Sequence, residues 1–217
     1  MRKTAPILEA TRLHPDRIAL ITRNVVWTYR DFGARIQEAA RRLRTLGVAA
    51  GTRVGVWAPN SSDWAVLAHA VGLAGGVLLP LNTRLTDHEL SFQASHADLL
   101  LASPDLASRA RKTFDKALPV LTFDGELPGI PSFWAIAPDP NPVSETLDLS
   151  APQAILFTSG TSGVPKAAVL SWANQFASAE ASGSVLPLTP DDRWIDCMPL
   201  FHVGGLNILY RCALAGA

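Results

Sequence analysis

The sequence has 217 residues, of which 48% are hydrophobic and 18% charged, and its 19 basic and 19 acidic side chains leave no formal net charge. This composition is typical of a globular protein with enough apolar residues for one large domain or two small ones. The neutral balance gives no reason to expect nucleic acid or an anionic membrane as a partner, and two cysteines are too few for a disulfide framework or a metal cluster.

No targeting or membrane segment is predicted. Met1-Arg2-Lys3 begins basic, but Pro6 and Glu9 follow and no apolar signal core appears. The longest apolar stretch, around residues 71–81, is well short of the ~20 residues that a membrane-spanning helix needs. We therefore expect a cytoplasmic protein without a membrane span.

Helical and strand patterns alternate along the first half of the chain. Apolar residues recur at helical spacing over residues 32–46, after a Thr28–Asp31 pair that resembles a capping box and before Gly47, which suits a helix end. Further helices are expected over residues 64–73, 86–97 and 106–114, and buried strands over residues 54–57, 77–79 and 99–101. These repeated units predict an α/β fold in which parallel sheets are covered by helices on both faces.

Prolines interrupt this pattern over residues 125–152, which we interpret as a proline-rich connection. A hairpin is expected next, with apolar strands at residues 154–157 and 167–170. Beyond it, Ser171 is expected to cap a helix that reaches about residue 185. A short strand over residues 193–197 and a final helix over residues 205–215 complete the predicted elements.

The loop of this hairpin is the most informative segment, and residues 157–170 read F-T-S-G-T-S-G-V-P-K-A-A-V-L. Gly160 and Gly163 permit the backbone angles with which successive amides form a concave anion site. Hydroxyl donors and one cation add to it: Thr158, Ser159, Thr161, Ser162 and Lys166. The spacing does not match the Walker pattern of kinases and GTPases. From the residues alone, a polyphosphate site and a flexible Gly/Ser loop both stay open.

The run T-S-G-T-S-G-V-P-K at residues 158–166 resembles the phosphate-binding signature of the adenylate-forming superfamily: acyl-CoA synthetases, luciferases and the adenylation domains of peptide synthetases. Residues 14–20, 27–29, 51–56 and 80–85 resemble other family segments in the same order, and P-L-F-H-V-G-G at residues 199–205 resembles its acid-pocket motif. One position departs, because most members carry glycine where this chain has Ala167. A methyl group there implies an ordinary β conformation, and a subset of o-succinylbenzoate–CoA ligases shares it.

The resemblance implies that residues 1–217 are the N-terminal part of the large AMP-binding (adenylation) domain. Family members are much longer, so the adenine- and ribose-binding segments and the C-terminal lid domain with its lysine are expected to be absent from this chain. The implied reaction is ATP-dependent activation of a carboxylic acid to an acyl-adenylate and then to a coenzyme A thioester. ATP, Mg²⁺ and coenzyme A are the implied cofactors and co-substrates, and homodimers are common in the family.

The same resemblance assigns roles to individual residues. The phosphate-binding set is Thr158, Ser159, Gly160, Thr161, Ser162, Gly163 and Lys166, with Thr161 also the metal contact. Thr161, Lys166 and His202 are the implied catalytic residues, although a protein carboxylate is an alternative partner for Lys166. His202 is implied to border the acyl pocket and to orient the reacting carboxylate, whereas a lone histidine in an apolar turn is otherwise more often a core residue. Gly204 and Gly205 are implied to leave room for the substrate.

Arg211 lies in an otherwise apolar segment, residues 206–214, that is expected to form a largely buried helix. A buried guanidinium needs an anionic partner, which is either a protein carboxylate or a second carboxylate on the substrate. The latter favours a dicarboxylic aryl acid, and the segment resembles o-succinylbenzoate–CoA ligases of menaquinone and phylloquinone biosynthesis. The alternatives are an aryl- or fatty-acyl-CoA ligase, and a non-catalytic fragment that binds polyphosphate without turnover.

Overall fold

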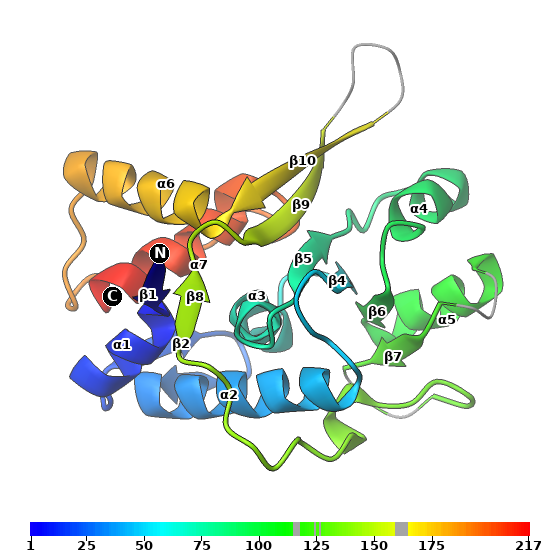
Figure 1. Cartoon of the computed structure of the whole chain (residues 1–217), viewed down its shortest axis with the longest axis horizontal. Helices are drawn as coiled ribbons and strands as arrows, with labels where there is room; N and C mark the ends of the chain where they lie inside the picture. Colours follow the sequence, from blue (N-terminus) through cyan, green and yellow to red (C-terminus); the bar gives the residue numbers. More distant parts are fainter. Residues whose placement is uncertain (115–117, 124, 126, 159–164) are drawn as a thin grey trace.

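The computed structural model describes residues 1–114, 118–123, 125, 127–158 and 165–217 (Figure 1). Its helices are α1 (Pro6–Leu13), α2 (Tyr29–Thr45), α3 (Ser62–Leu73), α4 (Asp87–Ala94), α5 (Pro104–Thr113), the 3-10 helix η1 (Phe133–Ala135), α6 (Trp172–Val185) and α7 (Val203–Ala215). Its strands are β1 (Arg2–Thr4), β2 (Ile18–Ile21), β3 (Val26–Thr28), β4 (Arg53–Trp57), β5 (Val77–Pro80), β6 (Leu99–Ala102), β7 (Val120–Thr122), β8 (Thr146–Asp148), β9 (Pro152–Thr158) and β10 (Lys166–Ser171).

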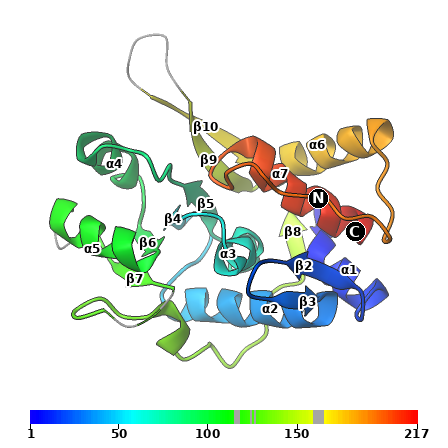
Figure 2. The same ribbon diagram turned by 180° about the vertical axis from the view of Figure 1, so that it is seen from behind.

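The central sheet has the strand order β10-β9-β5-β4-β6-β7. Neighbouring strands from β9 to β7 run parallel, and β10 pairs antiparallel with β9 at one edge. Two small antiparallel pairs, β1 with β8 and β2 with β3, lie outside this sheet. Figure 2 shows the same arrangement from behind. The predicted α/β class with a mainly parallel sheet is therefore confirmed.

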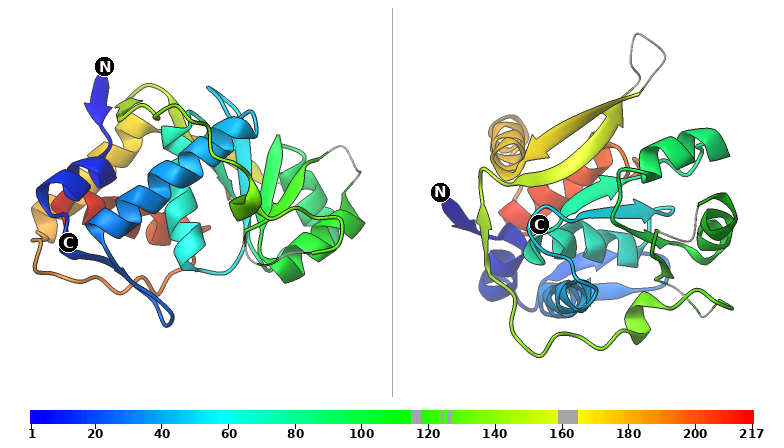
Figure 3. Two further views of the ribbon diagram at one scale, coloured as in Figure 1. Left: turned by 90° about the horizontal axis from the view of Figure 1, so that it is seen from below. Right: turned by 45° about the vertical axis from the view of Figure 1, so that its right-hand side comes forward.

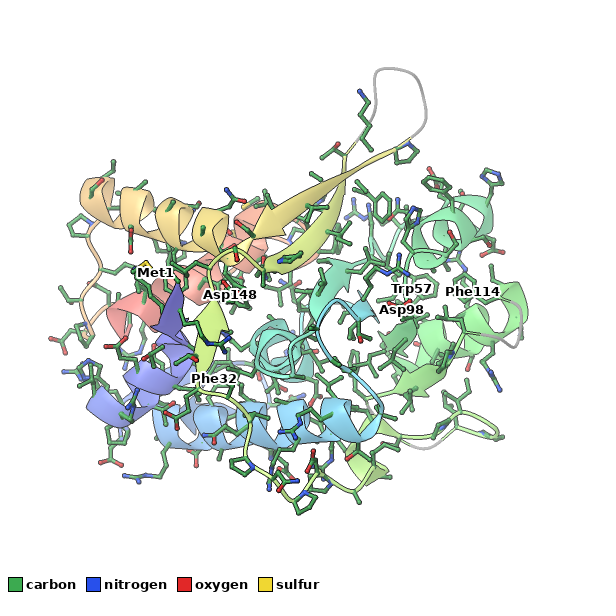
Figure 4. All side chains as sticks on the ribbon, in the orientation of Figure 1. Met1, Phe32, Trp57, Asp98, Phe114 and Asp148 are labelled. Atoms are coloured by element: carbon green, nitrogen blue, oxygen red, sulfur yellow. The ribbon has the colours of Figure 1, made fainter. Side chains whose placement is uncertain are left out.

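Alternate strand residues supply two separate cores, one on each face of the sheet. In β5, Leu78 belongs to the first core and Leu79 to the second, because successive side chains of a strand point to opposite faces. On the first face α3 packs against β4 and β5, and α2 packs against α3. On the second face α5 packs against β6 and β7, and α4 contributes Leu90. Figure 3 shows the helices of both layers, and Figure 4 shows Phe32 of the first core well apart from Trp57 of the second.

Capping side chains fix where three of the helices begin. Thr28 and Asp31 form a reciprocal capping box at the start of α2, Thr86 and Glu89 form one at α4, and Ser171 and Asn174 form one at α6. Each box satisfies two backbone amides that the first helical turn leaves without a partner. The starts predicted at Thr28, Thr86 and Ser171 are confirmed, although α4 ends at Ala94 instead of residue 97.

The strand predicted over residues 193–197 is wrong. The structure describes no strand there, and Ile195, which is 82% exposed, packs on neither core. Apolar alternation predicts a strand only where another strand accepts its backbone hydrogen bonds, and the described residues pair none with this segment. The described part of residues 125–152 includes the regular elements η1 and β8, and β8 joins β1 near the N-terminus.

Candidate functional site

The two strands predicted on either side of the candidate phosphate-binding loop are present as β9 and β10. Thr158 pairs with Lys166 and Phe157 with Ala167 in its antiparallel register, and Thr158 Oγ1 donates to the Lys166 carbonyl over 3.4 Å. Thr158 and Lys166 are both exposed at the open end of the hairpin, and none of the ion pairs among the described residues involves Lys166. Ser159, Gly160, Thr161, Ser162 and Gly163 lie outside the described residues.

Ala167 has the conformation that its methyl group implies. It lies within β10 opposite Phe157, and no residue other than glycine has a positive φ in the described part of the chain. The departure from glycine at this position is therefore compatible with regular strand pairing.

His202 caps the N-terminus of α7 with extended backbone angles, φ −100° and ψ 147°. Its amide donates to the Pro199 carbonyl over 3.0 Å, and its own carbonyl accepts from Leu206 over 3.0 Å. The side chain is exposed, with its ring centroid 4.6 Å from that of Phe201. The imidazole therefore faces solvent on a tightly turned backbone, and this residue is not the core histidine of the chain. That position belongs to His69, which is 5% exposed and whose pKa is lowered by burial to about 3.

The two glycines after His202 differ in what surrounds them. A Cβ atom on Gly205 would lie 2.6 Å from the Pro199 carbonyl oxygen and 2.9 Å from the Met198 carbonyl oxygen, both fixed backbone atoms. A Cβ atom on Gly204 would meet the flexible end of the Met198 side chain, with Cε at 2.6 Å. Close backbone packing under the turn is thus a sufficient reason for glycine at position 205.

Asn60 holds the turn before His202 in place, and the sequence analysis did not single it out. Its Nδ2 donates to the Met198 carbonyl over 2.8 Å, and its Oδ1 accepts from the Leu200 amide over 2.8 Å. Asn60 follows β4, at the carboxyl end of a parallel strand where binding residues gather in α/β folds. The position of Asn60 at a strand end is the signal that the sequence offers for a role in the site. Its hydrogen-bond partners could not be predicted, because they lie 138 and 140 positions away in the sequence.

Arg211 is not brought together with His202. Arg211 lies nine positions after this N-cap residue, which corresponds to about 13 Å along α7 and about two and a half turns, hence opposite sides of the helix. The guanidinium stacks over the Trp194 ring at 5.5 Å, and its Nε is buried without a hydrogen-bond partner in the described residues. It lines a cavity of about 200 Å³ with residues from the C-terminal half of α6, including Ser182.

A carboxyl group with a perturbed pKa lies close to this helix. Burial raises the pKa of Asp196 to about 6, with the backbone amide of Met198 acting in the opposite direction. Burial also raises the pKa of the Cys212 thiol to about 11, and the Asp196 charge adds to that effect while Arg211 opposes it. Asp196, Arg211 and Cys212 therefore share one electrostatic environment, which the spacing of these residues in the sequence does not predict.

Two further properties concern metals and membranes. Among the described residues, there is no group of three His, Cys, Asp or Glu side chains that could hold a metal ion. Magnesium is usually bound through one or two carboxylates together with substrate phosphates and waters, so it needs no dedicated cluster of protein ligands. None of the described helices is long and apolar enough to cross a membrane.

Comparisons with known proteins concern the chain as a whole. The model of the family described as AMP-binding enzyme matches residues 8–217. A 2-succinylbenzoate–CoA ligase from Bacillus cereus is 31% identical over 218 residues, which cover 100% of this chain and 43% of the relative. The o-succinylbenzoate coenzyme A synthetase of Bacillus subtilis, solved with ATP and magnesium, superposes with a TM-score of 0.88 at 26% identity, covering 100% of this chain and 56% of the other.

A second solved structure, from Rhodopseudomonas palustris and assigned as a long-chain-fatty-acid CoA ligase, is nearly as similar. Its TM-score is 0.87 at 27% identity, covering 98% of this chain and 55% of that one. The fold is therefore shared by proteins named for different acids. This chain spans less than half the length of the curated relative from Bacillus cereus.

Proposed function

Because the chain belongs to the AMP-binding enzyme family, we propose that its protein activates a carboxylic acid with ATP, first to an acyl-adenylate and then to a coenzyme A thioester. The observation that carries the proposal is the hairpin of β9 and β10, which presents Thr158 and Lys166 on either side of a hydroxyl- and glycine-rich segment. We take residues 1–217 as the N-terminal part of the adenylation domain, with residues 125–152 as its connecting segment.

In the first step an oxygen of the acid attacks the α-phosphorus of ATP, and the bond to the bridging oxygen breaks to release pyrophosphate. Charge gathers on the departing phosphates, where fixed donors stabilise it best. We assign this role to Thr158, Lys166 and the intervening residues 159–163, with Thr161 as the magnesium contact; bound magnesium would neutralise part of the same charge. In the second step the coenzyme A sulfur attacks the acyl carbon and AMP leaves.

His202 is the proposed neighbour of the reacting carboxylate, because it is exposed on a turn that Asn60 and the glycine at 205 hold rigidly. Its role is orientation, since a carboxylic acid is already ionised near neutral pH and needs no general base. Gly204 and Gly205 would leave space for the acid beside it. A cytoplasmic location and a homodimer belong to the same proposal.

The proposed acid is o-succinylbenzoate, the acid for which the Bacillus relatives are named, which would place the protein in menaquinone or phylloquinone biosynthesis. Arg211 is the candidate for binding the second carboxylate of that acid. The separation of Arg211 from His202 argues against this role. A substitution of Arg211 tests whether it binds the acid. Arg211→Ala should raise KM for o-succinylbenzoate and leave KM for ATP unchanged, whereas an unchanged KM for both would remove Arg211 from the acid site.

ATP–pyrophosphate exchange on the native protein, whose length mass spectrometry would establish, tests the function. Exchange dependent on o-succinylbenzoate is the expected result. Exchange with benzoate or octanoate but none with o-succinylbenzoate would favour the aryl- or fatty-acyl-CoA ligase, for which the Rhodopseudomonas palustris structure gives a precedent of fold. ATP binding without exchange for any acid would favour the non-catalytic, polyphosphate-binding alternative.

Lys166 provides a residue-level test of the phosphate assignment. Lys166→Ala should lower kcat for exchange by roughly a hundredfold, the effect of removing one preorganised donor from a developing charge, with little change in KM for the acid. Lys112→Ala is the matched control, because Lys112 is also a lysine at the surface but lies on α5. Equal activities of the two variants would contradict the assignment of Lys166.

A further inference from the structure

The hairpin of β9 and β10 is attached to the sheet at its inner end. The parallel pairing of β9 with β5 consists of the single register pair Leu78 with Ala154 in the described residues. The antiparallel pairing with β10 continues outward to Thr158 and Lys166. The outer part of the hairpin therefore extends beyond the last residue of β9 that is paired with β5, and Figure 1 shows it projecting upward past β5. Something other than sheet pairing must fix its direction.

Three aromatic rings provide that second attachment. The Phe157 ring lies 6.2 Å from the Phe92 ring and 5.4 Å from the His96 ring, and Phe92 and His96 lie 5.3 Å apart, all at steep angles. Such edge-to-face contacts are favourable beyond the area that they bury. His96 Nδ1 lies 3.0 Å from the Phe92 carbonyl oxygen, to which the tautomer with its proton on Nδ1 would donate. We call Phe92, His96 and Phe157 the aromatic anchor.

The anchor acts on the strand pair that precedes the proposed phosphate contacts. Residues directly opposite each other in an antiparallel pair share a face, and the next pair faces the other way. Phe157 and Ala167 form one such pair, so they lie on the face toward α4. Thr158 and Lys166 form the next pair and lie on the opposite face. Fixing the Phe157 ring therefore sets the direction in which Thr158 and Lys166 point.

We propose that the aromatic anchor is a positioning device, in which Phe92 and His96 hold the outer hairpin at the angle that aims Thr158 and Lys166 at the phosphates of ATP. The part concerning ATP rests on the proposed function. Phe92 lies outside the residues assigned to the reaction, and 38% of it is exposed, so its aromatic ring is not needed to fill a closed core. The anchor instead joins α4 to a strand more than sixty positions later in the chain.

Phe92→Ala tests the proposal with two readouts. Hydrogen exchange of the amides at residues 155–158 and 166–168 should accelerate on the order of tenfold, because two ring contacts are lost. KM for ATP in pyrophosphate exchange should rise by a similar factor, while KM for the acid stays unchanged. Phe92→Tyr, which keeps the ring, should restore both values.

Trp27→Ala is the matched control, because it removes an aromatic contact of the same length, with Phe32 at 6.2 Å, and the contact of Arg35 over the ring at 4.5 Å, both at the first core instead of the second. It should change neither hairpin exchange nor KM for ATP. Unchanged hairpin exchange in Phe92→Ala, or the same acceleration in Trp27→Ala, would overturn the anchor. Faster hairpin exchange in a protein that shows no adenylation with any acid would instead keep the anchor and reject the proposed function.

Discussion

Tyr210 ties α7 to both the sheet and α3, and Tyr210→Phe should reveal how much this connection stabilises the fold. The hydroxyl accepts from Gln153 Nε2 over 2.7 Å and donates to the Ala68 carbonyl over 2.7 Å, with Tyr210 3% and Gln153 1% exposed. Burial raises the pKa of Tyr210, so the hydroxyl remains a donor at ordinary pH.

The magnitude follows from what the variant leaves behind. Loss of the bond to Ala68 should cost about 1 kcal/mol, and a buried Gln153 donor without a partner should cost about 1–2 kcal/mol more. The ring contacts with His69 at 5.0 Å and Trp172 at 5.7 Å do not involve the hydroxyl. We therefore expect Tyr210→Phe to lower the free energy of unfolding by about 2–3 kcal/mol.

Urea denaturation followed by circular dichroism measures this value, and an unchanged m confirms that the same transition is compared. The decisive comparison uses Gln153→Leu as the background, where no donor is left stranded. There Tyr210→Phe should cost only about 1 kcal/mol. A cost below about 0.5 kcal/mol in the parent, or equal costs in the two backgrounds, would refute the reasoning.

Two further predictions concern the turn at His202 and its surroundings. Gly205→Ala should destabilise the protein by about 1–3 kcal/mol more than Gly204→Ala in the same denaturation assay, because only the former forces a Cβ atom against fixed backbone; equal effects would contradict this packing argument. Asp196 has a folded pKa near 6, above its ordinary value of 3.8, so its protonated form favours the folded state. That contribution is fully present below about pH 4 and is lost as the pH rises through 6. Asp196→Asn should therefore gain stability relative to the parent between pH 4 and 7, by an amount on the order of 1–2 kcal/mol once solvent screening is allowed for, whereas parallel stability–pH curves would count against a raised pKa.

Local signals carried most of what could be predicted. The starts of α2, α4 and α6 depend on residues three positions apart, and the hairpin depends on apolar runs that flank one loop. Both kinds of signal can be read from a short stretch of sequence, without knowledge of distant residues. The strand predicted at residues 193–197 failed because its pattern lacked the partner strand that turns alternation into pairing.

The site was harder to predict wherever its parts come from distant segments. Asn60 supports the His202 turn across 140 positions, and Phe92 meets Phe157 across more than sixty. No local pattern in a single sequence indicates that either pair is in contact. Arg211 shows a different limit: its need for a partner was anticipated, but a flat cation can also stack on an aromatic face, as it does on Trp194.

The order of strands in the sheet also determines when the hairpin can reach its place during folding. A hairpin closes within microseconds, because its contacts are close in sequence. Its docking onto β5 joins Leu78 to Ala154, 76 positions later, and that contact must first overcome the entropy of closing a long loop. The hairpin is therefore expected to form early and to dock late, after β4, β5 and β6 have paired. Variants that slow this docking would delay completion of the six-stranded sheet more than formation of the hairpin itself.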